Sequence, residues 1–371
     1  MISRSSGKRL SVVLVTDVDI PWSIHQRTHD VLHHLSADFD LTALYFSNVP
    51  MKKPLPCTTL RLPRKWLFPV RGVEIGRRLK QSGMTFDVAI TEGPWAGLVG
   101  MQLKMLRRAA VLIYEDLDYF PGDARTPLGK AVVIAAERLC VRRSDGVISV
   151  GHRLARLRRS QGGKVVTVIP NGADLTLFNR PRVPHRRFAL VYSGSLADWS
   201  GLDLVLRSLT LLRDRIPDVR FIIAGDGPRR STLEEIATRL RLEENVEFLG
   251  RVSYGDLPDV FAQADVGVAM LAPTDLTRPA FPLKLAEYLV AGLPVIVTAD
   301  TEMGDLVEAS GAGFSVPYEE DAVAQGIIRL QPGSPLHGRL VEGVKLIART
   351  LDWAKLMKTE ADFIRQIVDM S

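Results

Sequence analysis

Short apolar runs alternate with longer stretches of helical periodicity along most of the chain. In the first half, runs rich in β-branched and aromatic residues predict strands at LSVVLV, LTALYF, FDVAIT, AVLIYE, GVISV and VVTVIP. Helices are predicted between them at residues 25–36, 94–106 and 128–144. The Pro- and Lys/Arg-rich residues 47–70 indicate a long loop that holds one short strand, CTTLRL. Alternation of this kind is typical of parallel sheets covered by helices.

The same alternation restarts in the second half of the chain. It breaks at NRPRVPHRR, residues 179–187, a stretch suited to a linker. Further strands are predicted at FALVYSG, VRFIIAG, VEFLG, VGVAML, PVIVTA and FSV. The last segment predicts an amphipathic helix whose apolar side carries Trp353, Leu356, Phe363, Ile364 and Ile367. We therefore expect an α/β protein of two tandem doubly wound, Rossmann-like domains, residues 1–180 and 181–350, followed by a C-terminal helix at 351–371.

The predicted fold class already limits the function. In open parallel sheets, ligands bind beyond the carboxyl ends of the strands. Two such domains facing a central cleft would place one ligand on each side of it. This organisation predicts an enzyme with two substrates.

Charge is distributed unequally between the two halves. Residues 1–180 have a formal charge of +12 and residues 181–371 a charge of −6. Any one basic cluster is explained by a solvated helix face, but the total excess favours attraction to an anionic surface. A membrane is the preferred surface, because no nucleic-acid-binding module is evident.

Neither a membrane anchor nor a metal site is evident in the sequence. No apolar run approaches the roughly 20 residues of a membrane-spanning helix, and the first ten residues lack a signal-peptide core. The two cysteines, Cys57 and Cys140, have no metal-ligand spacing. We expect a cytoplasmic protein, with the basic half drawn to the inner face of a membrane.

Two motifs in the second half carry candidate chemistry. In FIIAGDGPRRSTLEEIA, a glycine turn opens a helix and can approach a nucleotide closely, although a plain strand-to-helix connection fits it equally well. In FPLKLAEYLVAGLPVIVT, Lys284 and Glu287 share one helix face. A cation at a helix start can hold a diphosphate, and a carboxylate one turn later can accept two hydrogen bonds from ribose. A surface ion pair is the alternative, and the apolar flanks argue against it.

These motifs together resemble a known enzyme family. The FPLK…EYL run is similar to the donor-site signature of family-four glycosyltransferases, which have the two-domain GT-B architecture. VIPNGADLTLF, FALVYSGSL, GLDLVLRSL, FIIAGDGPRRSTLEEIA and NVEFLGRVSYGDLPDVFAQADVGV resemble further family motifs in the family's order. The resemblance covers nearly the whole chain. It implies a glycosyltransferase that uses a nucleotide diphosphate sugar as co-substrate, and a final helix that crosses back to the first domain.

The resemblance assigns roles to individual residues of the second half. Glu287 corresponds to the glutamate that binds the donor ribose, and Lys284 to a lysine near the donor phosphates. Gly194 and Ser195 match a glycine-rich turn close to the diphosphate. The remaining matches are the base-pocket turn Asp226, Gly227 and Pro228, the residue Arg251 before the base-contacting loop, and Pro282 and Leu283, whose backbone would face phosphate.

Three positions depart from the family pattern. The first signature glutamate is replaced by Pro279, and the basic residues at the start of the second domain are replaced by Ser195 and Ser200. Lys284, with help from Arg278, would then balance the diphosphate. These departures leave open a silent nucleotide-binding subunit that partners an active transferase. A nucleotide-sugar epimerase of the same fold is a further alternative.

The acceptor side is less well marked. DVDIPWSIHQRTHDVLHHL resembles a W…QR subgroup in which Arg27 and His25 face acceptor and phosphates. The spacing of His25, His29 and His33 suggests a metal site only weakly, because no other ligand is near. In IYEDLDYFP, Glu115, Asp116 or Asp118 would act as base in an inverting enzyme, and helix capping is the competing explanation. The family implies a sugar or lipid-linked acceptor, no nucleic acid and no metal requirement. Nucleobase, sugar and stereochemistry stay open.

Overall fold

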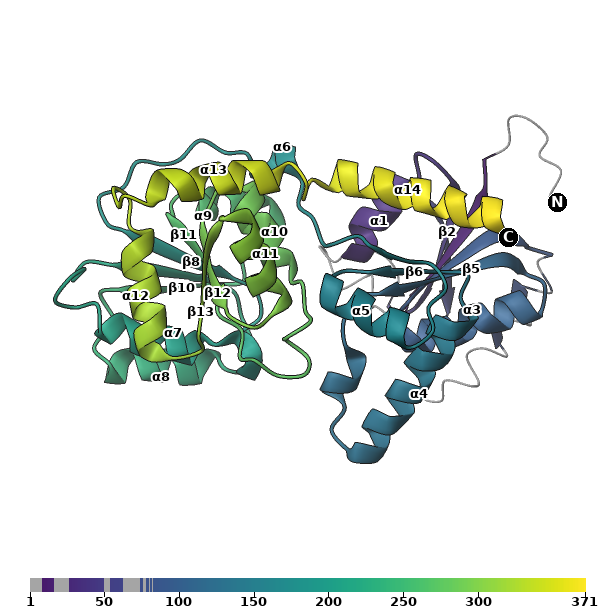
Figure 1. The fold of residues 1–371 in the computed structure, drawn as a ribbon, viewed down its shortest axis with the longest axis horizontal. Coiled ribbons are helices and arrows are strands. Elements are labelled where there is room, and N and C mark those ends of the chain that lie inside the picture. Colours follow the sequence, from purple (N-terminus) through teal and green to yellow (C-terminus); the bar gives the residue numbers. More distant parts are fainter. Residues whose placement is uncertain are drawn as a thin grey trace. The chain divides into compact units, whose positions relative to one another are not determined.

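The computed structural model describes residues 9–16, 27–49, 54–62, 74–75, 78–79, 81 and 83–371. The chain forms two compact units (Figure 1). The first comprises Met1–Pro170 and Ala354–Ser371, and the second comprises Asn171–Trp353. The last helix therefore belongs, from Ala354 onward, to the first unit.

The chain crosses from the first unit to the second before the predicted linker at residues 179–187. Residues 179–187 lie within the second unit. Val183 N donates to Ala262 O at 2.9 Å, and His185 Nε2 lies 2.9 Å from a carboxylate oxygen of Asp265. These backbone and side-chain bonds fix the Pro/Arg-rich stretch to the second unit, so the boundary lies at residues 170–171 and not near 180.

The first unit is built on one parallel sheet of seven strands. Their order is β3-β2-β1-β4-β5-β6-β7, and every neighbouring pair is parallel. The strands are β1 (Ser11–Thr16), β2 (Asp40–Phe46), β3 (Thr58–Leu62), β4 (Phe86–Glu92), β5 (Ala109–Asp116), β6 (Gly146–Ser149) and β7 (Val166–Val168). The predicted strands of this half are confirmed. Their near-continuous apolar character reflects a sheet that is covered on both faces.

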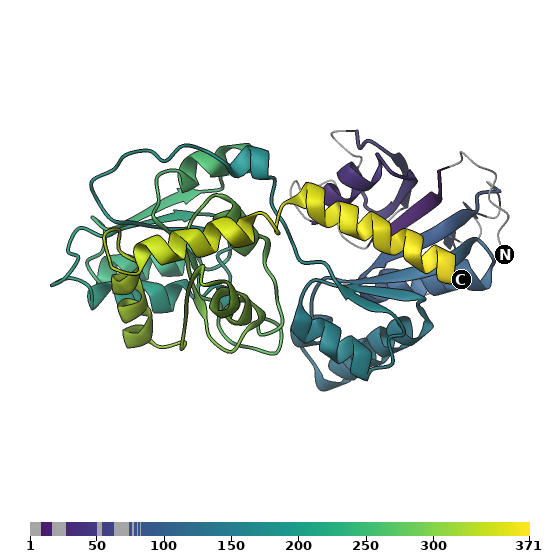
Figure 2. The ribbon, with the colours of Figure 1, turned by 45° about the horizontal axis from the view of Figure 1, so that its top comes forward.

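Helices cover this sheet. They are α1 (Arg27–Leu35), α3 (Gly93–Met105), the 3₁₀ helix η1 (Phe120–Asp123), α4 (Pro127–Arg143), α5 (His152–Ser160) and α14 (Trp353–Met370). Figure 2 shows α14, in yellow, lying across the sheet. A Cβ added at Gly146 of β6 would lie 2.9 Å from Ile367 and 3.0 Å from Phe363, so α14 packs directly on the strand. The predicted apolar side of the last helix is buried.

The second unit repeats this architecture with six parallel strands in the order β10-β9-β8-β11-β12-β13. They are β8 (Ala189–Ser193), β9 (Arg220–Ala224), β10 (Val246–Gly250), β11 (Val266–Ala269), β12 (Val295–Thr298) and β13 (Gly313–Val316). The helical elements are α6 (Leu175–Phe178), η2 (Asp198–Ser200), α7 (Leu202–Thr210), α8 (Arg230–Arg239), η3 (Tyr254–Asp256), α9 (Leu257–Phe261), α10 (Leu283–Val290), α11 (Glu302–Ser310), α12 (Glu320–Leu330) and α13 (His337–Ala348). The expected pair of doubly wound domains is therefore confirmed.

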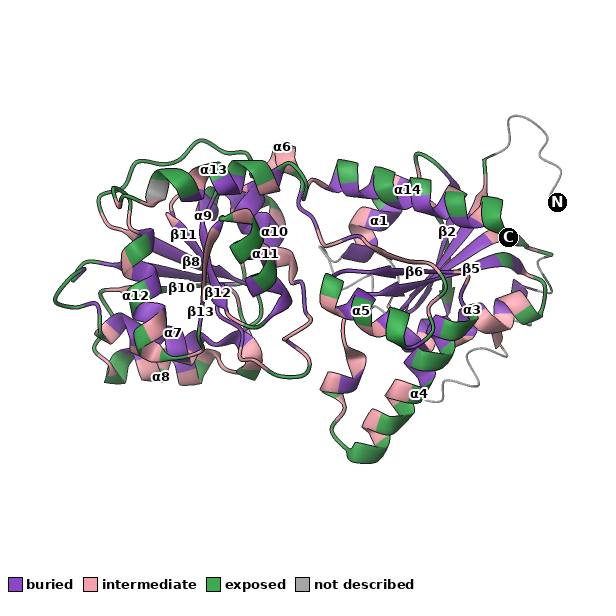
Figure 3. Cartoon of the chain, in the orientation of Figure 1, coloured by how far each residue is buried: buried purple, intermediate pink, exposed green. Residues whose placement is uncertain are grey.

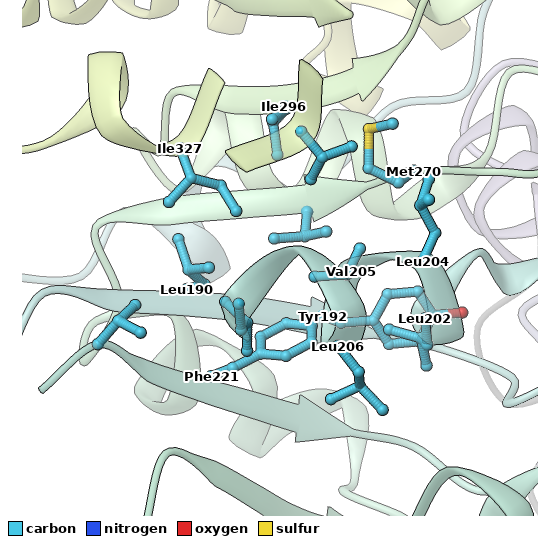
Figure 4. Close-up of a cluster of buried hydrophobic side chains, with 14 of the residues drawn as sticks. Leu190, Tyr192, Leu202, Leu204, Val205, Leu206, Phe221, Met270, Ile296 and Ile327 are labelled. Carbon is cyan, nitrogen blue, oxygen red and sulfur yellow. The ribbon is translucent and has the colours of Figure 1, made fainter. Parts of the chain in front are cut away.

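The core of the second unit surrounds the strand that leads into its first glycine turn. Tyr192 of β8 is buried among Leu202, Val205 and Phe221, with its hydroxyl oxygen at the edge of the cluster (Figure 4). Burial in both units is concentrated in the sheets and the helix faces that cover them (Figure 3). Among the described helices, none has both the length and the apolar character required to cross a bilayer.

Candidate functional site

Two glycine turns lie side by side at the carboxyl edge of the second sheet. One follows β8 and begins at Gly194, and the other follows β9 and contains Gly225 and Gly227. Gly194 N donates to Ala224 O at 3.0 Å, and Leu196 N donates to the carbonyl of the second turn at 3.1 Å. A Cβ at Gly225 would lie 1.9 Å from Gly194 O, and one at Gly227 would lie 2.6 Å from Leu196 O. Only glycine permits this close approach of the two backbones.

Lys284 lies directly beneath the first of these turns. Its Nζ lies 3.8 Å from the centroid of the Tyr192 ring and 5.8 Å from that of Trp199. A Cβ at Gly194 would lie 3.0 Å from the same Nζ. The side chain is 7% exposed, and its Nζ makes no hydrogen bond within the described part of the chain. A buried cation held by aromatic faces in this way is arranged to accept an anionic partner.

Burial sets the protonation of this lysine. Loss of solvation lowers the pKa of Lys284 from 10.5 to about 7, and the nearby Glu287 carboxylate opposes the change. The buried ammonium is therefore costly in the ligand-free protein, and an anion near Gly194 would stabilise it.

The helix that carries Lys284 is fixed from two directions. Tyr288 of α10 accepts a hydrogen bond from Ser193 N at 2.6 Å, and Gly267 of β11 leaves room for its ring, since a Cβ there would lie 2.5 Å from the ring carbons. Asn171 Nδ2 donates to Phe281 O at 2.5 Å, just before the helix. Pro282 occupies the N-cap, and no side chain caps α10. Its first amides are therefore available to an anion beside Lys284.

The other residues that the sequence analysis assigned to the donor side differ in their exposure. Glu287 is 6% exposed and lies one turn beyond Lys284 on α10. Ser195, Asp226 and Pro228 are exposed, while Pro282 and Leu283 are half-buried. Arg251 is exposed and follows Gly250, whose φ is +71°. The structure thus groups Gly194, Ser195, Asp226, Gly227, Lys284, Glu287 and their neighbours at one edge of one sheet.

The two serines that depart from the family pattern at the start of the second unit take part in local backbone hydrogen bonds. Ser195 O accepts the Tyr192 hydroxyl at 2.7 Å, which holds the aromatic ring under Lys284. Ser200 is buried in η2, with its amide bonded to Ala197 O at 3.0 Å. Arg278, predicted to help with the diphosphate, forms an exposed ion pair with Asp300.

In the first unit, Arg27 is the centre of a buried polar cluster. Its Nε donates to Glu115 at 2.5 Å, its second terminal nitrogen to Glu360 at 3.1 Å, and its first to Ile169 O and Pro170 O at 3.1 and 2.9 Å. Arg27 is 4% exposed. Burial acts to lower the pKa of Arg27, but the two carboxylates raise it overall. Arg27 was predicted to face the acceptor and phosphates; in this structure all three of its nitrogens bind protein groups.

Two carboxylates, Glu115 and Glu360, bond to this guanidinium, and a third, Glu92, lies close enough to feel its charge. Glu92 accepts from Thr28 Oγ1 at 2.7 Å, and one oxygen each of Glu92, Glu115 and Glu360 makes no hydrogen bond within the described residues. Burial raises the pKa of Glu92 and of Glu360 to about 8, and Glu115 adds to both shifts. The cluster therefore retains protons at neutral pH. It connects the carboxyl ends of β4 and β5 to α14.

Asp116 does not suit the role of a catalytic base. It is fully buried, and both of its oxygens accept hydrogen bonds from Arg158, at 2.8 and 2.7 Å. Arg158 also donates to Glu137 at 2.9 Å. A carboxylate held in this way stabilises the fold and is not free to accept a substrate proton.

Asp118 differs from Asp116 in its surroundings. It is half-buried on the segment between β5 and η1, at the carboxyl edge of the first sheet. Burial, followed by the charges of Asp116 and Asp123, raises the pKa of Asp118 to about 7. A carboxyl with this pKa can accept a proton at neutral pH. His25 lies outside the described residues, and His33 is exposed on α1.

Several partners in these clusters are not marked by any sequence motif. The aromatic cage of Lys284, formed by Tyr192 and Trp199, lies about ninety residues away in sequence from it. Arg158, Glu137 and Glu360 likewise belong to no recognisable pattern. Within the described residues, no group of three or more His, Cys, Asp or Glu side chains is arranged to hold a metal ion.

Comparison with known proteins covers most of the chain. Residues 12–172 match the family model "Glycosyl transferase 4-like domain", and residues 187–331 match "Glycosyl transferases group 1". The phosphatidylinositol N-acetylglucosaminyltransferase gpi3 subunit of Schizosaccharomyces pombe is 32% identical over 180 residues, which are 47% of this chain and 38% of that protein. The chain thus spans well under two thirds of this relative's length.

Solved structures share the whole fold. Sucrose-phosphate synthase from Thermosynechococcus elongatus superposes with a TM-score of 0.80 at 19% identity, covering 97% of this chain and 100% of that chain. HepE from Anabaena, in complex with UDP, gives a TM-score of 0.79 at 19% identity over 96% of this chain and 100% of that chain. At this identity, the likeness concerns the fold.

Proposed function

Because this chain belongs to the glycosyltransferases of GT-B fold, we propose that it moves a sugar from a nucleotide diphosphate sugar to an acceptor hydroxyl. The observation that carries the proposal is the buried Lys284 ammonium, which has no hydrogen-bonding partner among the described residues and lies under the Gly194 turn. This site has the charge and the exposed backbone that a diphosphate requires.

The donor would occupy the carboxyl edge of the second sheet. Lys284 and the first amides of α10 would neutralise the diphosphate, without a requirement for a metal ion. Glu287 would accept hydrogen bonds from the ribose hydroxyls. Asp226, Gly227, Pro228 and Arg251 would line the base pocket. The fold neighbour HepE was solved in complex with UDP, which supports a nucleotide ligand for this fold.

The acceptor would bind at the carboxyl edge of the first sheet. If the reaction inverts configuration, Asp118 would take the proton of the attacking hydroxyl, since its pKa lies near 7. We further propose a lipid-linked acceptor in glycolipid or surface polysaccharide assembly. A relative named for transfer to phosphatidylinositol and the basic first half of the chain support this substrate class. A cytoplasmic location at the inner face of a membrane would follow.

Thermal unfolding with uridine, guanosine, adenosine and thymidine diphosphates and their sugars tests the donor site. A ligand that binds only the native state raises the unfolding midpoint in proportion to the logarithm of its excess. We expect one diphosphate to raise the wild-type midpoint by several degrees and to have no effect on Glu287→Ala. Glu342→Ala, an exposed acidic position on α13, is the matched control and should respond like wild type.

A silent binding subunit is the second candidate. It is favoured by Pro279 and by the absence of a cation at Ser195 and Ser200. Diphosphate binding without release of sugar in the presence of lipid acceptors would favour it over the transferase. Isomerised nucleotide sugar formed without any acceptor would instead indicate an epimerase.

A further inference from the structure

Helix α4 carries an apolar stripe on the face that points away from its own unit. The stripe consists of Leu128, Ala131, Val132, Ala135 and Leu139. Leu128 is 76%, Val132 49% and Leu139 39% exposed, and both alanines are exposed. Their spacing of three or four residues places them on one side of the helix.

The stripe is not the face that packs against the sheet. Ala136, Glu137, Cys140 and Val141 are buried on the inward side. The Cys140 sulfur approaches α3, where a Cβ at Gly97 would lie 2.6 Å from it. Helix α4 is therefore apolar on two sides. Within the described part of the first unit, its outer side is uncovered for about three turns (Figure 3).

Basic side chains flank the stripe, and no exposed acidic side chain lies on the helix. Residues 124–143 contain five basic residues and one acidic residue, Glu137. That glutamate is buried and bonded to Arg158. Arg125, Arg138 and Arg143 are exposed. An exposed apolar stripe bordered by cations is the pattern of a helix that lies in a membrane interface.

We propose that α4 docks this chain onto an anionic lipid bilayer, with the Leu128–Leu139 stripe inserted at the headgroup boundary and the flanking arginines on the lipid phosphates. The link between this docking surface and a lipid-linked acceptor rests on the proposed function. Helix α4 is the element that would bring the chain to such an acceptor. The start of α4 follows η1 in the chain, and η1 follows the segment that carries Asp118.

The chemistry of this face disfavours a second copy of the chain as occupant. Two such helices would bring like charges together. The stripe is roughly 16 Å long, whereas stable interfaces bury roughly 800 Å² per partner. Neither difficulty arises with a bilayer of anionic phospholipid, which neutralises the arginines and accepts a narrow apolar face.

Flotation with vesicles tests the docking surface directly. The full chain is mixed with vesicles of phosphatidylcholine alone, or of phosphatidylcholine and phosphatidylglycerol in equal parts. We expect binding to the anionic vesicles, weakened by added salt. The double variant Leu128→Ser with Val132→Ser should bind at least about tenfold more weakly, given the transfer free energy of the two side chains. Arg138→Glu with Arg143→Glu should lower binding by a similar factor.

Leu346→Ser, at a leucine of α13 that is 69% exposed, is the matched control and should bind like wild type. Equal binding by the double variant and wild type overturns the proposal, as does equal binding to both kinds of vesicle. A change in oligomeric mass without loss of vesicle binding overturns it too, and identifies the stripe as a self-contact.

The assay needs neither donor nor turnover, so its result is separate from that of the proposed function. Vesicle binding by a wild type that neither binds nucleotides nor turns over would refute only the transferase. Conversely, the double variant could still be stabilised by nucleotide and still bind vesicles as well as wild type does. That result would refute only the docking surface.

Discussion

The Nζ of Lys284 lies 3.8 Å from the centroid of the Tyr192 ring, and the hydroxyl of that same tyrosine donates to Ser195 O at 2.7 Å. One aromatic side chain thus supports the buried cation and orders the glycine turn above it. The two halves of the candidate phosphate site are coupled through Tyr192.

Replacement of Lys284 should increase the stability of the ligand-free protein but abolish diphosphate binding. Lys284→Met removes a buried ammonium with no hydrogen bond in the described residues, so the ligand-free protein should gain roughly 1–3 kcal/mol at neutral pH. The same variant should lose stabilisation by the diphosphate. Urea denaturation with and without nucleotide measures both. Lys345→Met, at an exposed lysine of α13, should change neither. A destabilised Lys284→Met variant would contradict the assignment of Lys284 to an anion site.

Donor affinity should depend on pH because the cation must be protonated to bind phosphate. With a pKa of about 7 in the free protein, Lys284 is charged below that pH and neutral above it. Affinity for an intact nucleotide sugar should be flat at acidic pH and fall by up to about tenfold per pH unit above 7. Calorimetry in buffers of different ionisation enthalpy should detect proton uptake. A donor affinity that stays constant up to about pH 9 would show that binding does not depend on the charge of Lys284.

The Arg27 cluster should make stability fall as pH rises. Glu92 and Glu360 have their pKa raised from 4.5 to about 8, so the folded state holds protons that the unfolded state has released. Their contribution is complete below about pH 4.5 and is lost as pH rises to about 8. Denaturation across this range should show a smaller loss for Glu92→Gln with Glu360→Gln than for wild type. Arg27→Ala, which removes the ion-pair partner of the buried Glu115 carboxylate, should cost roughly 3–5 kcal/mol.

The two aspartates after β5 should respond differently to substitution. Asp116→Asn breaks a buried bidentate pair with Arg158 and should destabilise the protein by roughly 3–5 kcal/mol. Asp118→Asn should leave the unfolding midpoint nearly unchanged and lower kcat by roughly a hundredfold if the enzyme inverts. Wild-type turnover would then rise with pH through about 7. Asp214→Asn, at an exposed aspartate of the second unit, is the control. Full activity of Asp118→Asn would remove it as the base.

The close approach of the two turns should not tolerate a methyl group. In Gly225→Ala the new Cβ would lie 1.9 Å from Gly194 O, so the turns must separate. We expect a loss of roughly 2–4 kcal/mol in stability and loss of nucleotide binding. Gly255→Ala, where no atom lies within 4 Å of the added Cβ, should behave like wild type in both measurements.

The two sheets and the main elements of the donor edge follow from the amino-acid pattern alone. Runs such as FIIAG and PVIVT are typical of buried parallel strands, and short strands with helices between them favour a doubly wound sheet in each unit. Lys284 and Glu287 could be assigned to one helix face because their spacing is local.

Which charges are available for chemistry depends instead on tertiary packing. Asp116 and Asp118 are two residues apart and look equivalent in sequence. Arg158 forms an ion pair with Asp116, however, whereas burial raises the pKa of Asp118. Glu360 joins Arg27 across more than three hundred residues, and Tyr192 reaches Lys284 from another strand. The pKa of a buried group and the partner of a charge depend on which segments, remote in sequence, pack together. The residues next to each group in the sequence do not specify those partners.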